Sequence, residues 1–587
     1  MPEVITDNLD LWTSALLIKS TAGRGSNGKL EAYGIKKLRE LILELAVRGN
    51  LVPQDPSDEA APELLKRTNA KKKRLIEEGV IRETKPPVFP IESPEYELPT
   101  SWVWTNLFEL GEIAPRNEAE DTVEASFVPM QAISEKYGLP IHHEVKPWGE
   151  IKSGFTHFRE EDVVLAKITP CFQNGKSAVM RGLTNGFGAG TTELHVYRAV
   201  NACTVPEYVL IYLKSPRFIS DGIPKMTGTA GQKRITRDYF AGNYFPLPPL
   251  AEQHRIIAKV DELMALCDQL EQQQTHSLAA HQTLVETLLG TLTRVESQQE
   301  FRAAWARLAS HFDTLFTTEA SIDQLKQTIL QLAVMGKLVP QNSNDEPASV
   351  LLENIAKEKK RLIDEGKINK DKPLPDWAGD ELPFNLPRGW SWTKFENIVD
   401  ITSGITLGRK LAGKKIVTLP YLRVANVQRG FLELDVMKEI ELPEDEIDKF
   451  TVLERDLLIT EGGDWDKVGR TAIWRNELPL VVHQNHVFKA RCILKEQNEL
   501  WLEKYLNSEV ARDYFAGSSK QTTNLASINK TQLRRCLVAI PPLAEQHRIV
   551  AKVDELMALC DALKACFADA QTTQLHLADA IVEQAVR

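Results

Sequence analysis

The chain has 587 residues, of which 43% are hydrophobic and 26% are charged, and its formal net charge is -10. This length is several times that of one domain, and the absence of any run of about 18 apolar residues excludes a membrane-spanning protein. Seven cysteines without a CxxC pair or a matching histidine spacing argue against a disulfide framework and a metal site. Because the start lacks a secretory signal, we expect a cytoplasmic protein.

The first predicted element is a helical block within residues 1–98. An apolar stripe that includes Leu38, Leu41 and Leu45 stops before Gly49, a typical residue at a helix end. The same block returns later, because LRELILELAVRGNLVPQ from Leu38 matches LKQTILQLAVMGKLVPQ 287 residues further on. A long period of this kind indicates a duplicated chain.

Residues 99–247 follow with a different composition, in which β-branched and aromatic runs alternate with glycine and proline. Residues 162–168 predict a strand, Asn174 and Gly175 predict a turn, and residues 177–180 predict the returning strand. Residues 387–540 repeat this layout with different loops. We therefore expect two mixed α/β domains with a common frame, domain 1 at 99–247 and domain 2 at 387–540.

A helix with a heptad pattern is predicted after each of these domains. PPLAEQHRIIAKVDELMALCD from Pro248 and PPLAEQHRIVAKVDELMALCD from Pro541 agree at 20 of 21 positions, at an offset of 293. Ile256, Val260, Leu263, Cys267 and Leu270 form the apolar seam of the first copy. Each 21-residue segment would span about 32 Å, close to one turn of DNA.

The order of these parts predicts the architecture. We expect an α+β chain with a pseudo-two-fold internal repeat, in which a central helical spacer (248–386) and a C-terminal helical spacer (541–587) form an antiparallel pair of long helices, a coiled coil, between the two domains. The last helix lacks the helical block that follows the first one. The N-terminal region 1–98 can supply that block, so we predict that it packs with the C-terminal helix.

The double occurrence of PPLAEQHRI, each copy closing a variable region and opening a heptad helix, resembles the specificity subunits of Type I restriction-modification systems. The resemblance covers nearly the whole chain. It implies that each domain is a target-recognition domain for one half of a bipartite, asymmetric site in double-stranded DNA. It also implies partners, namely two modification (methyltransferase) subunits for adenine methylation and restriction (translocase and nuclease) subunits. S-adenosylmethionine, ATP and Mg would be bound by those partners, and no cofactor by this chain.

The predicted DNA contacts come from local charge, because charges more than about 8–10 Å away are largely screened. Residues 225–237 hold four basic and no acidic residues, and residues 401–432 hold six basic and no acidic residues. The alternative is a solvated basic loop. The candidate DNA-binding residues are Lys225, Gln232, Lys233, Arg234 and Arg237 in domain 1, and Arg409, Lys410, Lys414, Lys415, Arg429, Gln521 and Asn524 in domain 2.

The identical helix starts are predicted to cap the helices and to contact two identical partner subunits. The residues of this predicted interface are Glu252, Gln253, Arg255, Glu545, Gln546 and Arg548.

No catalytic residue is predicted. The sequence NGKS at Asn174 lacks the first glycine of a phosphate-binding loop, and neither Pro-Pro pair has the flanking residues of an adenine methyltransferase motif. Two alternatives stay open, a self-contained DNA methyltransferase or nuclease and a purely structural coiled-coil scaffold.

Overall fold

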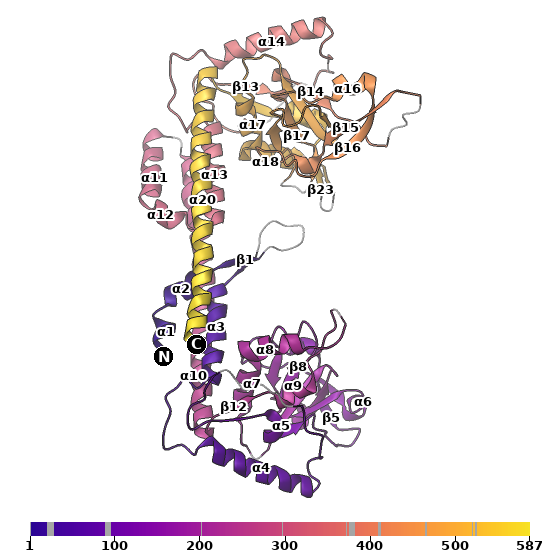
Figure 1. Ribbon diagram of the computed structural model, residues 1–587. Helices are drawn as coiled ribbons and strands as arrows, with labels where there is room; N and C mark the ends of the chain where they lie inside the picture. The colour runs from indigo at the N-terminus through magenta and orange to yellow at the C-terminus, as the bar shows by residue number, and fades with distance from the viewer. Residues whose placement is uncertain are drawn as a thin grey trace. The chain divides into compact units, whose positions relative to one another are not determined.

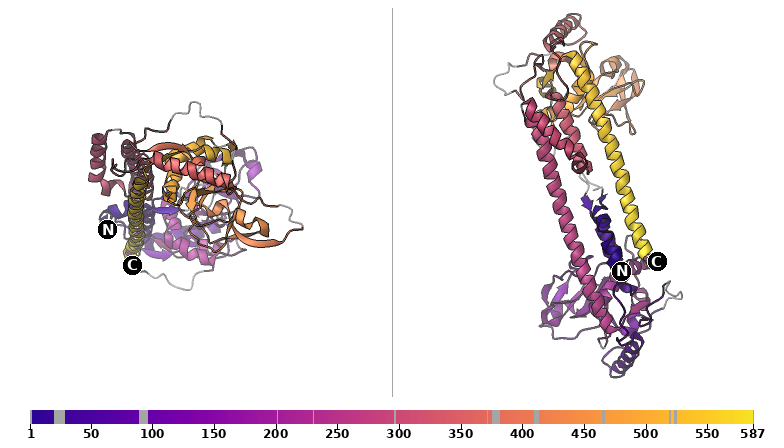
Figure 2. Two further views of the ribbon diagram at one scale, coloured as in Figure 1. Left: turned by 90° about the horizontal axis from the view of Figure 1, so that it is seen from above. Right: turned by 90° about the vertical axis from the view of Figure 1, so that its left-hand side faces the viewer.

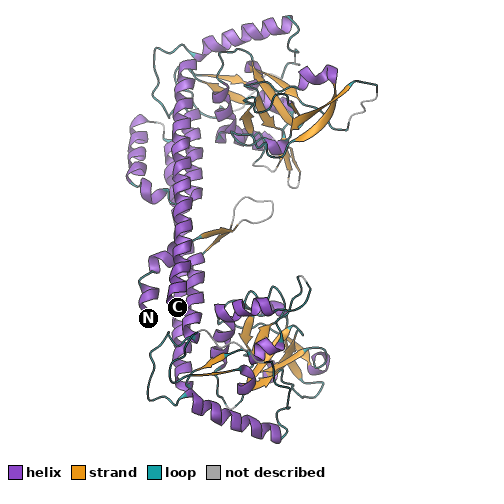
Figure 3. Cartoon of the chain, in the orientation of Figure 1, coloured by secondary structure: helices purple, strands orange, loops and turns teal. Residues whose placement is uncertain are grey.

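The computed structural model describes residues 2–19, 29–88, 96–200, 202–229, 231–295, 297–370, 372–374, 382–408, 413–463, 467–518, 520–522 and 525–586. The chain divides into two compact units (Figure 1). Unit 1 consists of Met1–Leu278 and Asp569–Arg587, and unit 2 consists of Ala279–Ala568. Each unit contains a helical bundle and one of the two predicted recognition domains. The structure has the predicted α+β character, with the strands confined almost entirely to those domains (Figure 3).

Three helices form the bundle of unit 1. They are α3 (Tyr33–Val47), the first part of α10 (Leu250–Arg294) and the end of α20 (Leu543–Val586). The predicted seam residues Ile256, Val260, Leu263 and Cys267 are buried in one core with Leu38 and Ile42 of α3 and Ala578 of α20. In Figure 2, right, indigo α3 lies between magenta α10 and yellow α20. The smaller elements beside the bundle are α1 (Pro2–Thr6), α2 (Leu9–Ser14), β1 (Leu17–Lys19), β2 (Lys29–Glu31) and α4 (Ala61–Glu77).

Polar contacts fix the direction of each helix in this bundle. The Tyr33 hydroxyl donates to Asp579 at 2.8 Å, and the Arg48 side chain donates to the carbonyl of Val586, so α3 and α20 run parallel. Arg39 binds Asp268 of α10 at 2.6 Å, whereas Gln54, further along the chain, binds Glu252 near the start of α10 at 2.7 Å. Since α10 runs against α3, it is antiparallel to α20. The pairing of the N-terminal region with the last helix is the one that the order of the repeats predicts.

Unit 2 contains the same bundle with the roles of the long helices exchanged. Its helices are α13 (Glu319–Val334), the start of α20 and the end of α10, with α11 (Gln298–Ser310), α12 (Phe312–Leu315) and α14 (Ala348–Asp364) beside them. Lys326 binds Asp561 at 2.5 Å, and Gln324 donates to Glu286 at 3.1 Å. The predicted helix pair is therefore completed in each unit by a third helix, α3 or α13. No helix in the described ranges has both the length and the apolar character that crossing a bilayer requires.

Domain 1 is built on two four-stranded sheets, in the orders β4-β11-β8-β9 and β6-β5-β10-β7, and on the antiparallel pair β3 and β12. Its strands are β3 (Val103–Thr105), β4 (Gly111–Ile113), β5 (Glu124–Val128), β6 (Glu144–Pro147), β7 (Thr156–Arg159), β8 (Val163–Ala166), β9 (Ser177–Val179), β10 (Phe187–Gly190), β11 (Leu194–Ala199) and β12 (Phe245–Leu247). Its helices are α5 (Leu107–Leu110), η1 (Met130–Ala132), α6 (Trp148–Ile151), η2 (Thr184–Gly186), α7 (Pro206–Lys214), α8 (Pro216–Gly222), η3 (Ile223–Lys225) and α9 (Arg237–Gly242).

Domain 2 repeats the first of these sheets as β14-β21-β17-β19 and the strand pair as β13 and β24. Its sheet β16-β15-β20 has the same pairings as β6-β5-β10 of domain 1, and it adds the three-stranded sheet β18-β23-β22. Its strands are β13 (Ser391–Lys394), β14 (Val399–Ser403), β15 (Ile416–Leu422), β16 (Lys438–Pro443), β17 (Leu457–Thr460), β18 (Gly462–Gly463), β19 (Thr471–Ile473), β20 (Val482–His483), β21 (Val487–Cys492), β22 (Lys520–Thr522), β23 (Leu525–Ser527) and β24 (Leu537–Ile540). Its helices are α15 (Phe395–Ile398), η4 (Val424–Asn426), η5 (Glu444–Glu446), α16 (Ile447–Phe450), α17 (Glu499–Asn507), α18 (Glu509–Ser518) and α19 (Lys530–Arg535).

The predicted strand, turn and returning strand are present in both domains. β8 pairs antiparallel with β9, and β17 pairs antiparallel with β19. All four residues of β8 and of β17 are buried, which explains their continuous apolar sequence. A buried aspartate precedes each strand and binds an arginine on the neighbouring strand, Asp162 with Arg198 at 2.8 Å and Asp456 with Arg491 at 2.7 Å. The two domains therefore share one frame.

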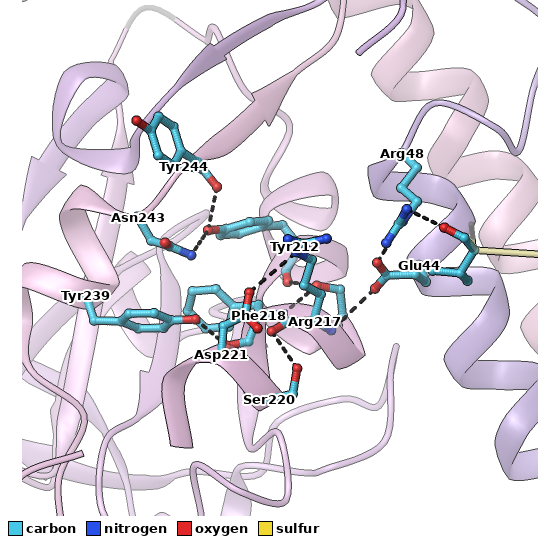
Figure 4. Close-up of polar contacts among 12 residues, drawn as sticks. Glu44, Arg48, Tyr212, Arg217, Phe218, Ser220, Asp221, Tyr239, Asn243 and Tyr244 are labelled. Atoms are coloured by element: carbon cyan, nitrogen blue, oxygen red, sulfur yellow. Dashed lines mark hydrogen bonds and ion pairs between the residues drawn. The ribbon is translucent and has the colours of Figure 1, made fainter. Parts of the chain in front are cut away.

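Buried polar contacts attach domain 1 to α3 (Figure 4). The carboxylate of Glu44 accepts a hydrogen bond from the Arg48 side chain at 2.9 Å and from the backbone N–H of Arg217, at the start of α8, at 3.3 Å. Behind this contact the Tyr239 hydroxyl donates to the carbonyl of Phe218 at 2.6 Å. Glu44 is 4% exposed, so its charge is satisfied inside the unit.

Candidate nucleic-acid interface

Two short segments pair antiparallel at the corresponding place in each domain. In domain 1, Thr227 and Arg234 form a β-bridge, and in domain 2, β22 pairs with β23 in a register that sets Lys520 opposite Ser527. We call residues 227–234 and 520–527 the edge hairpins; residues 230, 523 and 524 lie outside the described part. The residue after each hairpin donates its backbone N–H to the segment that follows the buried strand, Ile235 to Lys167 and Ile528 to Glu461, each at 2.8 Å.

The edge hairpin of domain 1 carries the exposed candidates Gln232 and Lys233, and a third exposed candidate, Lys225, lies before it at the end of η3. Lys225 lies over the ring of Tyr239, with its ammonium 5.3 Å from the ring centroid. Within the described residues, neither Lys225 nor Lys233 forms an ion pair. Both ammonium groups can therefore meet a phosphate without first leaving a carboxylate.

The two arginine candidates of domain 1 already have partners within the chain. Arg234 binds Glu193 at 2.8 Å, and these hydrogen bonds lower the pKa of the Glu193 carboxyl. Arg237 donates to the carbonyl of Lys85 at 3.2 Å, which holds the linker before domain 1 against α9. Their guanidinium groups reach DNA only by giving up contacts that stabilise the domain.

A second loop adjoins each edge hairpin, and the sequence analysis did not select it. It comprises residues 167–176 in domain 1 and, in domain 2, the described residues 461–463 and 467–470, which include β18, and we call it the after-strand loop. In domain 1 its Thr169 N–H donates to the carbonyl of Lys233 at 2.9 Å, and it presents exposed Gln173 and Asn174 beside half-buried Lys176. These residues are polar and basic, but they are separated from residues 225–237 in the sequence, so no local charge count joins them.

The candidates of domain 2 fall into three groups. Arg409, Lys410 and Asn524 lie outside the described residues. Gln521 is in β22 opposite Ala526, and Arg429 is half-buried between η4 and β16. Lys414 and Lys415 precede β15, and both side chains bind carboxylates.

The basic stretch that precedes β15 is neutralised in the folded domain. The ladder between β15 and β16 brings the start of one strand next to the end of the other, with Ile416 opposite Pro443. Lys415 consequently binds Glu444 at 2.7 Å, and Lys414 binds Glu446 at 3.2 Å. The local charge of this stretch is therefore smaller at the surface than its sequence indicates.

The predicted partner interface at the start of α10 needs a correction. The side chains of Glu252 and Gln253 are 0% exposed. Glu252 accepts from the Trp102 ring N–H at 3.0 Å, and burial raises the pKa of its carboxyl. Gln253 accepts from the backbone N–H of Val205 at 2.9 Å. These side chains attach the long helix to domain 1 and are not accessible to another subunit in this fold.

The second copy is used in the same way. Glu545 and Gln546 are 1% and 3% exposed, and Gln546 donates to the carbonyl of Pro541 at 2.9 Å. The arginines of both copies are part-exposed but paired, Arg255 with Asp58 at 2.7 Å and Arg548 with an equivalent aspartate at 2.6 Å. The repeated AEQHR sequence is thus explained by contacts within the chain, and a partner contact stays a prediction only for the two arginines.

No group of three or more metal-ligating side chains occurs among the residues that the structure describes. Burial lowers the pKa of His483 to about 4, and its Nδ1 bonds the carbonyl of Val487 at 2.7 Å, so this histidine is a neutral core residue at physiological pH.

Comparison with known proteins gives three similarities. A family profile described as "Type I restriction modification DNA specificity domain" matches residues 99–280 and 387–566. The specificity subunits of the Type I restriction enzymes EcoAI and EcoEI from Escherichia coli are 47% and 44% identical, and each alignment covers 100% of this chain and 99% of that protein. A crystal structure of the HsdS subunit from Thermoanaerobacter tengcongensis is 20% identical, covers 84% of this chain and 98% of that one, and has a TM-score of 0.43.

Proposed function

The chain belongs to the family of Type I restriction-modification DNA specificity subunits, which are non-catalytic, and on that basis we propose that its two domains read the unlike halves of one bipartite, asymmetric DNA site. The observation that carries the proposal is that the two domains share their buried strands and differ in the segments at the surface. The buried strands and ion pairs of the two domains coincide, whereas the edge hairpins and after-strand loops differ in sequence and charge. A common frame with different edges suits two different base sequences.

The proposed partners follow from the duplication. Two nearly identical helical segments within a pseudo-symmetric chain suit two identical modification subunits, and the local dyads of duplex DNA suit the same symmetry. We propose that those subunits methylate adenine and bind S-adenosylmethionine, and that restriction subunits with ATP and Mg complete the complex in the cytoplasm. This chain would bind none of these cofactors.

Phosphate and base contacts are assigned to different residues. The unpaired ammonium groups of Lys225 and Lys233 would contact phosphates. Gln232 and the exposed amides Gln173 and Asn174 would contact base edges, because an amide can donate and accept at once.

The decisive experiment maps methylated adenines in genomic DNA from cells that express this chain with its modification subunit. The expected result is one motif with two unlike halves. A variant in which residues 387–540 are replaced by residues 99–247 should convert that motif into two inverted copies of a single half-site. If the exchanged variant methylates the original motif, the assignment of one half-site to each domain is wrong.

The spacer between the half-sites is proposed to depend on the long helices. Inserting one heptad into both α10 and α20 should change the number of base pairs in the spacer of the mapped motif. An unchanged spacer with retained methylation would contradict this role.

A further inference from the structure

A lysine is buried at the end of α7. Lys214 is 6% exposed and follows five buried residues, from Val209 to Leu213. Its ammonium donates to the carbonyl oxygens of Ser134 at 3.1 Å, Glu135 at 3.0 Å and Gly175 at 3.0 Å. An ammonium has three donors, so all of them are used.

These three acceptors belong to two different loops. Ser134 and Glu135 are in the turn after η1, and Gly175 is in the after-strand loop, next to exposed Asn174. The same after-strand loop is hydrogen-bonded at its start to the edge hairpin, through Thr169 and Lys233. Lys214 therefore fixes the end of a loop whose beginning is fixed by the hairpin.

The turn held by Lys214 is also anchored to the bundle. The hydroxyl of Tyr137 donates to Asp261 of α10 at 3.0 Å. Hydrogen bonds thus run from the long helix through this turn and Lys214 to the after-strand loop. A displacement at either end would move the exposed amides of that loop relative to the edge hairpin.

Domain 2 has a different residue at the corresponding place. Asn507 is the last residue of α17, as Lys214 is of α7, and it is 6% exposed. Its side chain accepts from the backbone N–H of Thr471 at 3.1 Å and donates to the carbonyl of Thr471 at 2.8 Å. Thr471 directly follows the after-strand loop of domain 2. Both domains therefore fix this loop from the end of the same helix, with chemistry that differs as their loops differ.

Burial lowers the pKa of Lys214 to about 7, because the interior disfavours the charged form. An apolar side chain would avoid that cost but would leave the three carbonyl oxygens without this donor. What the lysine adds is a fixed distance between two loops that lie beside the candidate DNA contacts.

We propose that Lys214 is a positioning residue for sequence discrimination by domain 1, which acts by holding the after-strand loop in register with the edge hairpin. The inference rests on the proposed function. It assigns no DNA contact to Lys214, whose donors are all directed at backbone carbonyls. Asn507 has the corresponding role in domain 2.

The test replaces Lys214 by methionine, which is unbranched and one atom shorter and removes the donors. The variant is expressed in the full chain with the modification subunit, and methylated adenines are mapped. We expect about a tenfold loss of discrimination at one or more base positions of the half-site read by domain 1, with the other half-site unchanged. Asn507→Leu should lower discrimination in the half-site read by domain 2 and leave the other half-site unchanged.

Tyr208→Phe is the matched control, since it removes one buried hydrogen bond from the same helix, to the carbonyl of Pro246 at 2.9 Å, away from both loops. This control should lower stability and keep both half-sites. If Tyr208→Phe relaxes the same position, or if Lys214→Met keeps full discrimination, the proposal is overturned. If the Lys214→Met chain fails to assemble with the modification subunit, methylated adenines are mapped with Lys214→Gln instead, because glutamine keeps two donors. Failure of the proposed function can be distinguished from failure of this proposal, because the chain without substitutions would then give no bipartite motif.

Discussion

Replacing Lys225 and Lys233 by alanine is expected to flatten the salt dependence of DNA binding. Lys225 lies before the edge hairpin of domain 1 and Lys233 lies within it, and neither forms an ion pair among the described residues, so each can displace one counterion from DNA. A phosphate contact contributes about 0.9 to the slope of log K against log salt, so the double variant should lose about 1.8. Between about 50 and 200 mM salt this corresponds to about a tenfold smaller loss of affinity.

The control removes charges that are already paired. Lys414 and Lys415 bind Glu446 and Glu444, and a variant with Lys414→Met, Lys415→Met, Glu444→Gln and Glu446→Gln keeps the local net charge. We expect its slope to change by less than about 0.3. Fluorescence anisotropy of the complex with modification subunits, on target and on unrelated duplexes, measures both slopes.

The variants of the unpaired and of the paired lysines can be compared on target and on unrelated DNA. Loss of affinity in the Lys225 and Lys233 variant should be similar on target and unrelated DNA, because phosphates are present in every sequence. Equal changes of slope in both variants would refute the reasoning that internal carboxylates neutralise the basic stretch of domain 2.

Three further predictions concern stability. Burial lowers the pKa of His483 to about 4, so the stability that depends on its neutral ring is complete above about pH 6.5. About 3 kcal/mol of this stability is lost as the pH falls toward 4. Urea denaturation should show that His483→Gln removes this pH dependence and that exposed His486→Gln does not. Arg198→Met leaves Asp162 buried without its partner and should cost about 3 kcal/mol in the same assay, and adding Asp162→Asn should recover part of it. Deleting residues 569–587 should reduce hydrogen-exchange protection in α3 and leave α13 unchanged; equal losses in both helices would contradict the division into units.

Much of the fold could be predicted from the repeat, because the repeated segments form the same helices and strands in both units. The seam residues such as Val260 are buried, and the predicted strand and its return are β8 and β9. The order of the repeats predicts that the N-terminal block packs with the last helix, but it does not predict that α3 also contacts α10. The apolar stripe around Leu38 is as clear as that of the long helices, but a pattern on one helix does not identify all the neighbours that cover it.

The candidate site was predicted less completely, for two physical reasons. Charge counts along the chain omit residues that a strand ladder brings together, so Lys415 was selected without its partner Glu444. The edge hairpins have almost no sequence in common, so the equivalence of Arg234 and Ser527 appears only in their backbone pairing. Conversely, Glu252 and Glu545 are both buried, so contacts within the chain account for their identity, which sequence alone does not distinguish from a shared partner contact.

The composition of unit 1 from both ends of the chain has a consequence for biosynthesis. Unit 2 is one continuous segment, so a nascent chain can close it as soon as residues 279–568 have left the ribosome. Residues 1–278 of unit 1 have emerged before, but the helix segment that carries Asp579 is translated only after unit 2, so α3 meets this second partner late. The half that is synthesised first is therefore the half that is finished last.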